Sequence, residues 1–123
     1  MKKLVAFLLF IVSISCTPQK KEKIVVVDYQ TFKENIIDKN VQLIDVRTAT
    51  EYESGFIDDA ININFLDTEN FKKEIETLDK NKPVYIYCRS GNRSGKASQI
   101  FVDKGFTKVV DLSGRYLNWK KNQ

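Results

Sequence analysis

The sequence predicts an α/β domain with a mainly parallel five-stranded sheet and helices on both of its faces. Two observations support this fold class. From residue 24 onward, short apolar runs rich in β-branched residues alternate with longer segments of helical periodicity. Strands that follow one another through a helix pair in parallel by right-handed crossovers. The chain has 123 residues, 42% of them hydrophobic and 29% charged, which suffices for one domain with a core of its own.

Five segments are expected to form the strands. Residues 23–29 and 41–46 are continuously apolar and β-branched at their centres, which is typical of strands buried on both faces. Residues 60–65 alternate between apolar and polar, which suits a strand near an edge. Residues 83–88 and 108–112 complete the set.

Four segments have apolar residues at helical spacing. They are residues 29–39, 68–80, 93–106 and 116–122. Asp28 is the expected N-cap of the first helix, and Gly105 is a typical residue just beyond the end of the third. There is no internal repeat and no second domain in this pattern. Sites in open parallel sheets lie beyond the carboxyl ends of the strands, and Cys88 stands at such an end.

The first fifteen residues have the layout of a secretory signal peptide. Two lysines precede an apolar run over residues 4–14, and small residues follow it. That run of about eleven residues is far shorter than the roughly 20 that a membrane-spanning helix needs. The cysteine at position 16 resembles the lipidated cysteine of bacterial lipoprotein signals, although Ser13 stands where such signals usually carry leucine.

We therefore expect residues 1–15 to be a signal peptide, residues 16–23 a lipid-anchored tether, and residues 24–123 the folded domain. The domain would face the periplasmic side of a bacterial membrane, held by a lipid on Cys16; a form without lipid, secreted or retained at the membrane, is the alternative. Without the first fifteen residues the net charge falls from +4 to +2, and basic and acidic residues are interleaved. Nucleic-acid binding needs a basic stripe, so we expect no nucleic-acid partner, and we expect a monomer.

Cys88 is the residue that points most directly to a function. If Cys16 is acylated, Cys88 is the one free thiol in an exported protein, where unpaired thiols are unusual. A buried structural cysteine is the alternative interpretation. The chain contains no histidine, which excludes a Cys–His pair, a Ser–His–Asp triad and any metal site built on histidine.

The residues after Cys88 offer another way to activate a thiol. Gly91 permits a tight turn, and a helix can begin near Ser94. The amide groups of a loop that enters a helix form a nest for an anion. The helix dipole and the guanidinium groups of Arg89 and Arg93 are expected to favour the thiolate over the thiol.

Three stretches resemble the rhodanese sulfurtransferase family in its single-domain form. "CRSGNRS" (residues 88–94) is similar to the family's active-site loop. "LIDVRTATEYESGFIDDAINI" (residues 43–63) and "VVDLSGRYLNW" (residues 109–119) are similar to two further family segments. The chain departs from the family at Phe56, where histidine is usual, and in the closing segment, where Ser113-Gly114-Arg115-Tyr116 replaces the usual glycine pair. The resemblance covers nearly everything from residue 24 to residue 120 and implies a rhodanese-like fold.

The resemblance also implies the chemistry of a rhodanese-type sulfurtransferase of the thiosulfate:cyanide kind. Cys88 would take sulfane sulfur from a small donor anion such as thiosulfate, hold it as a persulfide, and pass it to a thiol or to cyanide. Asp45 and Arg47 would support the active-site loop, although an ordinary ion pair between Arg47 and Glu51 is an alternative. No cofactor and no metal are implied. The residues of the substrate-binding loop are Arg89, Ser90, Gly91, Asn92, Arg93 and Ser94.

Three rival functions are less well supported. Phosphatases and arsenate reductases of related fold that use the phosphatase signature place arginine six positions after the cysteine, whereas here the sixth position is Ser94 and the arginine is Arg93. A membrane-tethered, non-catalytic module for sulfur carriage or partner binding is possible, but the intact Cys88 argues against it. A thiol redox role would require a resolving cysteine, which a lone thiol lacks.

Overall fold

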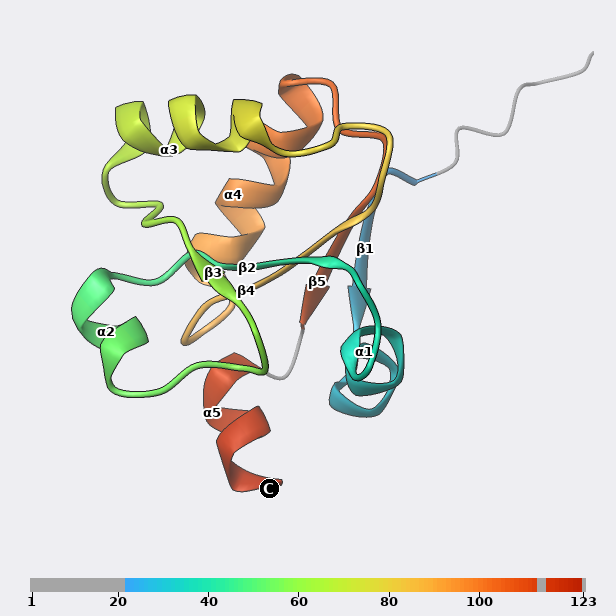
Figure 1. Cartoon of the computed structure of the whole chain (residues 1–123), viewed down its shortest axis with the longest axis vertical. Coiled ribbons are helices and arrows are strands. Elements are labelled where there is room, and N and C mark those ends of the chain that lie inside the picture. Colours follow the sequence, from blue (N-terminus) through green and yellow to red (C-terminus); the bar gives the residue numbers. More distant parts are fainter. Residues whose placement is uncertain (1–21, 113–114, 123) are drawn as a thin grey trace, which may run out of the picture.

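The computed structural model describes residues 22–112 and 115–122. Its elements, shown in Figure 1, are β1 (Ile24–Val27), α1 (Tyr29–Ile36), β2 (Gln42–Asp45), α2 (Ala49–Glu53), β3 (Ile61–Asn62), α3 (Thr68–Glu74), the 3-10 helix η1 (Ile75–Thr77), β4 (Val84–Tyr87), α4 (Asn92–Asp103), β5 (Val109–Leu112) and α5 (Arg115–Lys121). The predicted signal peptide, Cys16 and most of the predicted tether lie outside these residues. Within the described stretches, no helix is long and apolar enough to cross a membrane.

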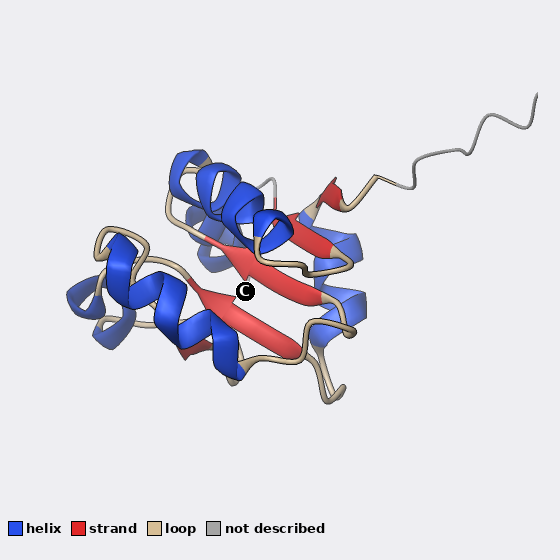
Figure 2. Ribbon diagram, turned by 90° about the horizontal axis from the view of Figure 1, so that it is seen from above, coloured by secondary structure: helices blue, strands red, loops and turns tan. Residues whose placement is uncertain are grey.

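The five strands form one sheet in the order β1-β5-β4-β2-β3, and every pairing is parallel. This confirms the predicted α/β fold. The order places β4 at the centre, between β5 and β2, so that its carboxyl end lies beside those of its two neighbours. Figure 2 shows the sheet with helices packed on either side of it. Cys88, directly after β4, therefore lies at the middle of the edge where the strands end.

Two clusters of buried side chains, one on each face, hold the helices to the sheet. Side chains alternate between the faces along each strand, so neighbouring residues of β4 enter different clusters. Ile86 and Cys88 belong to the cluster beneath α3 and α4, together with Phe71 and Phe101. Tyr87 belongs to the opposite cluster, which also contains residues of α1 and α5.

The signals that start and stop the helices act as the sequence predicts. Asp28 caps α1, because its carboxylate accepts a hydrogen bond of 2.8 Å from the Thr31 amide. This bond lowers the pKa of the Asp28 carboxyl. Gly105 follows the end of α4 with φ of 95°, a conformation that glycine adopts without strain.

The strand β1 differs from the expectation that it is buried on both faces. It lies at the edge of the sheet and pairs only with β5. Val26 consequently keeps 60% of its surface exposed, although its sequence context is as apolar as that of a central strand. The apolar run identified the strand correctly, but it does not distinguish an edge position from a central one.

The helix α2 was not expected from the sequence, because it is only five residues long and buries none of its side chains. A capping box holds its first turn: the Glu51 amide donates to Thr48 Oγ1 at 3.2 Å, and the Thr48 amide donates to Glu51 Oε1 at 3.4 Å. A threonine followed three residues later by glutamate is the sequence signature of this motif.

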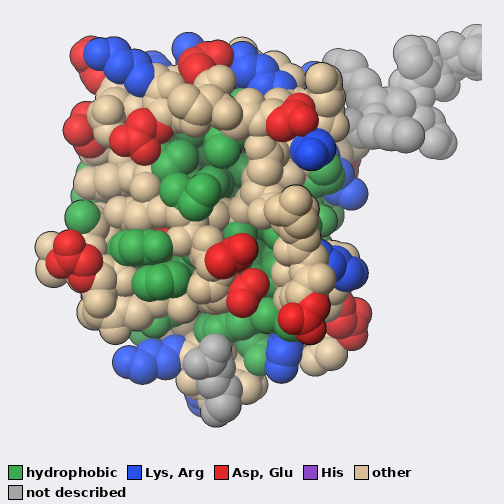
Figure 3. Space-filling model, viewed as in Figure 1, with side chains coloured by type: hydrophobic (Ala, Val, Ile, Leu, Met, Phe, Trp, Pro, Cys, Tyr) green, Lys and Arg blue, Asp and Glu red, His purple; other side chains and the backbone are tan. Residues whose placement is uncertain are grey.

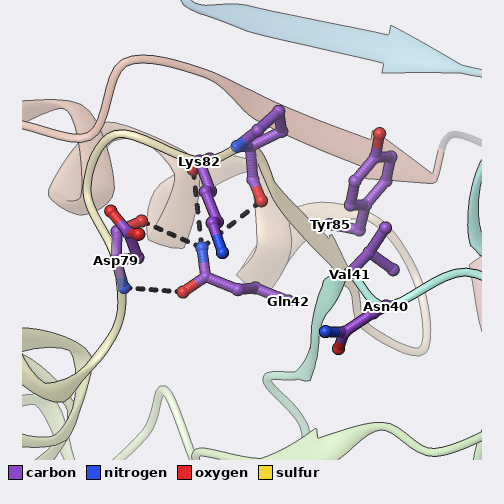
Figure 4. A pocket seen from close by; sticks show the side chains of 7 residues that line it. Asn40, Val41, Gln42, Asp79, Lys82 and Tyr85 are labelled. Atoms are coloured by element: carbon purple, nitrogen blue, oxygen red, sulfur yellow. Dashed lines mark hydrogen bonds between the residues drawn. The ribbon is translucent and has the colours of Figure 1, made fainter.

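A shallow pocket lies at the opposite edge of the sheet from Cys88, where β2 and β4 begin (Figure 4). The Gln42 side chain crosses it and binds the loop before β4. Its Nε2 donates to the Asp79 carbonyl at 2.9 Å, and its Oε1 accepts from the Asp79 amide at 2.6 Å. Because its amide oxygen and nitrogen both bond to protein backbone, we assign Gln42 a structural role in fixing that loop.

Replacing Gln42 with alanine should lower the free energy of unfolding by about 1–3 kcal/mol, because the Asp79 amide and carbonyl lose their partners. Urea denaturation measures this change. The control is Gln30→Ala, since the exposed Gln30 side chain bonds, among the described residues, to Glu34 of its own helix. This variant should cost less than about 0.5 kcal/mol. Equal losses in the two variants would contradict the structural role of Gln42.

Candidate active site

The Cys88 sulfur lies at the end of β4, beneath the loop that leads into α4. It forms no disulfide, and the residue is fully buried. The Gly91 amide donates a hydrogen bond of 2.9 Å to Sγ, and the thiol itself donates to Ser94 Oγ at 3.4 Å. Of the amides expected to face the sulfur, that of Gly91 therefore makes direct contact.

Gly91 makes this geometry possible, because it adopts φ of 83° at the N-cap of α4. Residues with a Cβ rarely take this conformation. No side chain caps the first turn of α4, so its leading amides are available to an anion beside the sulfur. Ser90 and Asn92, which flank the glycine, are both exposed at the surface of the loop.

The two arginines of the loop occupy different environments. Arg89 is exposed to solvent. Arg93 turns towards α2 and binds both carboxylate oxygens of Glu51, at 2.7 and 3.0 Å. This bidentate pair lowers the pKa of the Glu51 carboxyl to about 2, against the opposing effect of burial. Arg93 therefore fixes the loop to α2, and its charge is largely compensated there.

Arg47 pairs with Asp45, not with Glu51, so the ion pair considered between Arg47 and Glu51 is wrong. Arg47 donates through Nη2 to Asp45 Oδ2 at 2.6 Å, and both residues are buried. The same nitrogen donates to the carbonyl of Gly55 at 2.6 Å, which ties the end of β2 to the turn after α2.

The Asp45–Arg47 pair contacts the neighbours of Cys88. The Tyr87 hydroxyl donates to Asp45 Oδ2 at 2.9 Å, and burial, followed by the nearby carboxylate, raises the pKa of Tyr87 so that it stays a neutral donor. The Arg47 guanidinium lies 3.8 Å from the centre of the Tyr116 ring, and the Tyr116 amide donates to the Cys88 carbonyl at 3.1 Å. Asp45 and Arg47 thus reach the active-site loop through two tyrosines.

A groove of about 210 Å³ lies beside the loop, between α2 and α5. Two of its lining residues, Arg89 and Lys120, are positively charged, and a third, Leu117, is apolar and half-exposed. The ion pairs of the described residues do not include Arg89 or Lys120. The lining residues are Arg47, Glu51, Ser54, Arg89, Tyr116, Leu117 and Lys120.

Asp111 is a buried residue near the site, and no sequence motif assigns it a role. It lies in β5, beside Ile86 of β4, and only 5% of it is exposed. Burial raises the pKa of its carboxyl to about 6, while the nearby Ser94 side chain opposes that rise. A polar residue within the apolar run 109–112 is the signal in the sequence that could have drawn attention to it.

The sequence departs from the rhodanese pattern at Phe56 and at the closing segment that contains Arg115. Phe56 is 44% exposed and stacks on Tyr52, with ring centres 4.3 Å apart. The side chain of Arg115 lies outside what the structure describes. Over residues 22–112 and 115–122, no cluster of three or more His, Cys, Asp or Glu residues could hold a metal ion.

Comparison with known proteins identifies the family. The sequence profile of the "Rhodanese-like domain" family matches residues 28–122. The chain belongs to the rhodanese-like domain family. A human single-domain sulfurtransferase, TSTD1, has the same fold, with a TM-score of 0.69 and 21% identity over 80% of this chain and 96% of that chain.

Curated relatives within the rhodanese-like family include proteins of different lengths. The uncharacterized protein YqhL of Bacillus subtilis is 41% identical over 81 residues, which cover 66% of this chain and 62% of the relative. A thiosulfate sulfurtransferase, GlpE, of Shewanella oneidensis is 33% identical over 66% of this chain and 77% of its own length. The chain thus spans less than two thirds of YqhL and more than two thirds of GlpE.

Replacing Glu51 with glutamine should lower the free energy of unfolding by about 1–2 kcal/mol at neutral pH, because Arg93 loses a charged partner. The pKa of Glu51 is depressed in the folded state, so its contribution is present above about pH 4.5 and is lost as the pH falls towards about 2. Urea denaturation over this pH range should therefore show the two proteins converging in acid.

The matched control is Glu53→Gln, which removes the same charge from an exposed residue of the same helix. It should leave the free energy of unfolding within about 0.5 kcal/mol of the wild-type value. A difference between wild type and the Glu51 variant that persists unchanged in acid would contradict the pairing with Arg93.

Proposed function

We propose that the protein is a sulfurtransferase in which Cys88 carries sulfane sulfur as a persulfide. The observation that carries the proposal is the Gly91 amide, which donates to the Cys88 sulfur at 2.9 Å and would stabilise a negative charge there. Membership of the rhodanese-like family and relatives named as sulfurtransferases support the same conclusion.

The first half-reaction loads Cys88. Its thiolate attacks the outer sulfur of a donor such as thiosulfate, a new S–S bond forms, and the bond between that sulfur and the sulfonate sulfur breaks. Sulfite leaves with the electron pair, and the terminal sulfur of the persulfide retains the negative charge. Arg89 would attract the donor's sulfonate oxygens, because it is exposed beside the loop and unpaired among the described residues.

The second half-reaction returns Cys88 to its starting form. A nucleophilic acceptor, a cellular thiolate or cyanide in an assay, attacks the outer sulfur of the persulfide. The S–S bond to Cys88 breaks and Cys88 leaves as the thiolate, so that no oxidant or reductant is consumed. The groove between α2 and α5 offers the acceptor a binding surface next to the loop. Covalent storage of sulfur separates the two half-reactions.

The pairing of Arg93 supports sulfur transfer over phosphoryl transfer. A phosphatase loop needs an arginine whose guanidinium is directed at the phosphoryl oxygens. Here the Arg93 guanidinium is bound to Glu51 through two hydrogen bonds, of 2.7 and 3.0 Å. Recognition of the donor anion would consequently rely on backbone amides and on Arg89.

Thiosulfate should increase the intact mass of the protein by one sulfur atom, and cyanide or dithiothreitol should reverse the increase. The measurement is intact mass spectrometry, with Cys88→Ser as the variant that should gain no sulfur. Cys16→Ser is the companion control and should gain sulfur like the wild type. A folded protein with a titratable Cys88 that gains no sulfur would contradict this proposal for thiosulfate and favour a non-catalytic module or another donor.

A second proposal concerns the N-terminus, which lies outside the described residues. We propose that residues 1–15 are removed on export, and that Cys16 is lipidated and holds the domain at the periplasmic face of a bacterial membrane. The apolar run and the position of Cys16 in the sequence support this proposal.

Cells fed a tagged fatty acid should label the full chain, and Cys16→Ser should abolish the label while leaving the domain folded. Cys88→Ser is the control and should be labelled like the wild type. A wild-type protein recovered from cells with an unmodified Cys16 would contradict the lipid anchor.

A further inference from the structure

The mechanism above makes no use of Asp111, although its carboxyl is the buried acidic group beneath the N-terminal half of α4. Asp111 is 5% exposed, and its Oδ1 has no hydrogen-bond partner within the part of the chain that the structure describes. A buried carboxylate without full hydrogen bonding is costly. The residue must therefore be neutral part of the time, or another group must compensate its charge.

The register of the sheet places Asp111 on the same face as Cys88. Asp111 pairs with Ile86, which is two residues before Cys88 on the neighbouring strand. Ile86 and Cys88 both belong to the cluster beneath α3 and α4, and so does Val109, two residues before Asp111. Because side chains alternate along a strand, the Asp111 carboxyl faces α4 as the Cys88 sulfur does.

Ser94 connects the two groups. It is fully buried, and its Oγ accepts from the Cys88 thiol at 3.4 Å. Its hydroxyl donates to the Gly91 carbonyl at 3.3 Å. It also lies close enough to the Asp111 carboxyl to oppose the rise of that group's pKa. A hydroxyl has one proton and two lone pairs, so a Ser94 hydroxyl that turns from the Gly91 carbonyl to Asp111 can accept from the thiol while it donates to the carboxylate.

We infer that Asp111 holds a proton whenever the Cys88 sulfur is negatively charged, and that Ser94 relays the hydrogen bond between them. When the thiol ionises, the Ser94 hydroxyl turns from the Gly91 carbonyl to the Asp111 carboxylate, the thiol proton passes to Ser94 Oγ, and the Ser94 proton passes to Asp111. The products are a thiolate, an unchanged serine and a carboxylic acid, so the proton is conserved within the protein. Asp111 then donates to Ser94, and Ser94 donates to the anionic sulfur.

Burial gives this arrangement its physical basis. Two negative charges in one water-poor region repel each other, so Asp111 and Cys88 are expected to share a single negative charge between them. The raised pKa of Asp111, about 6, puts its protonation close to neutral pH. In other enzymes, too, an apolar site keeps a carboxylic acid neutral, so that the acid can donate a hydrogen bond to an anionic centre.

Few other titratable or charged groups surround Asp111. The adjoining strand β4 is followed by Cys88, and its two titratable residues, Tyr85 and Tyr87, belong to the cluster on the opposite face. The other neighbour, β1, contributes apolar residues only. From α4 the charged candidates are Arg93, which is bound to Glu51, and Lys96, which is exposed. The coupling between Asp111 and Cys88 is therefore not masked by a nearer ion pair among the described residues.

The test measures the ultraviolet absorbance of the Cys88 thiolate against pH in the full chain carrying Cys16→Ser, with the spectrum of Cys88→Ser subtracted. Asp111→Asn should move the midpoint to lower pH and give at least about three times more thiolate in the rising part of the curve. The asparagine has no charge and still donates to Ser94. Asp103→Asn, an exposed change on α4, should leave the curve in place.

Two further variants separate a relay through Ser94 from repulsion through space. Asp111→Leu removes the charge and also the donor, so its midpoint should lie above that of Asp111→Asn. In a Ser94→Ala background, the effect of Asp111→Asn should be clearly smaller, because only the repulsion through space remains. An unchanged midpoint in Asp111→Asn, equal midpoints in the asparagine and leucine variants, or an undiminished effect without Ser94 would each overturn the inference.

This inference rests on the proposed role of Cys88 as a nucleophile, but its test does not depend on a sulfur donor. Thiolate absorbance reports the ionisation of Cys88 whether or not thiosulfate loads it. If the protein shows the predicted coupling but gains no sulfur, the Asp111 inference is supported and the proposed donor is contradicted. If the protein gains sulfur but shows no coupling between Asp111 and Cys88, the proposed donor is supported and the Asp111 inference is contradicted.

Discussion

The hydrogen bond of 2.9 Å from the Gly91 amide to the Cys88 sulfur is the contact on which the proposed chemistry depends. It exists because β4 ends at the centre of the sheet and α4 begins only four residues after Cys88. A loop this short must turn through a positive φ, which Gly91 supplies at 83°. The sheet, the core and the helix therefore serve to hold one amide group against one sulfur atom.

The charges around the loop are divided between support and recognition. Asp45 with Arg47, and Glu51 with Arg93, form two ion pairs that fix the ends of β2, α2 and α4 relative to one another. Arg89 remains outside both pairs and faces solvent beside the loop. Positive and negative side chains are interspersed on the face of the molecule shown in Figure 3. Attraction of a small anion to this site would accordingly be local, due to the loop and Arg89.

Much of this organisation can be predicted from the sequence, because apolar runs and helical periodicity report burial directly. The five strands, the parallel sheet and the position of Cys88 follow from such patterns. The pairing of Arg93 with Glu51 does not, since the two residues are 42 positions apart and several acidic residues could have served. The position of Asp111 cannot be predicted for a related reason: only the register of β5 on β4 brings it to the face of the reactive thiol.

The central claim, that Cys88 stores sulfur between two separate half-reactions, is tested most directly by initial rates measured while thiosulfate and cyanide are both varied. If sulfite leaves the enzyme before the acceptor binds, the Cys88 persulfide is a free intermediate, and double-reciprocal plots should show parallel lines. Lines that intersect would show that donor and acceptor must be bound together, and would contradict transfer through a free Cys88 persulfide.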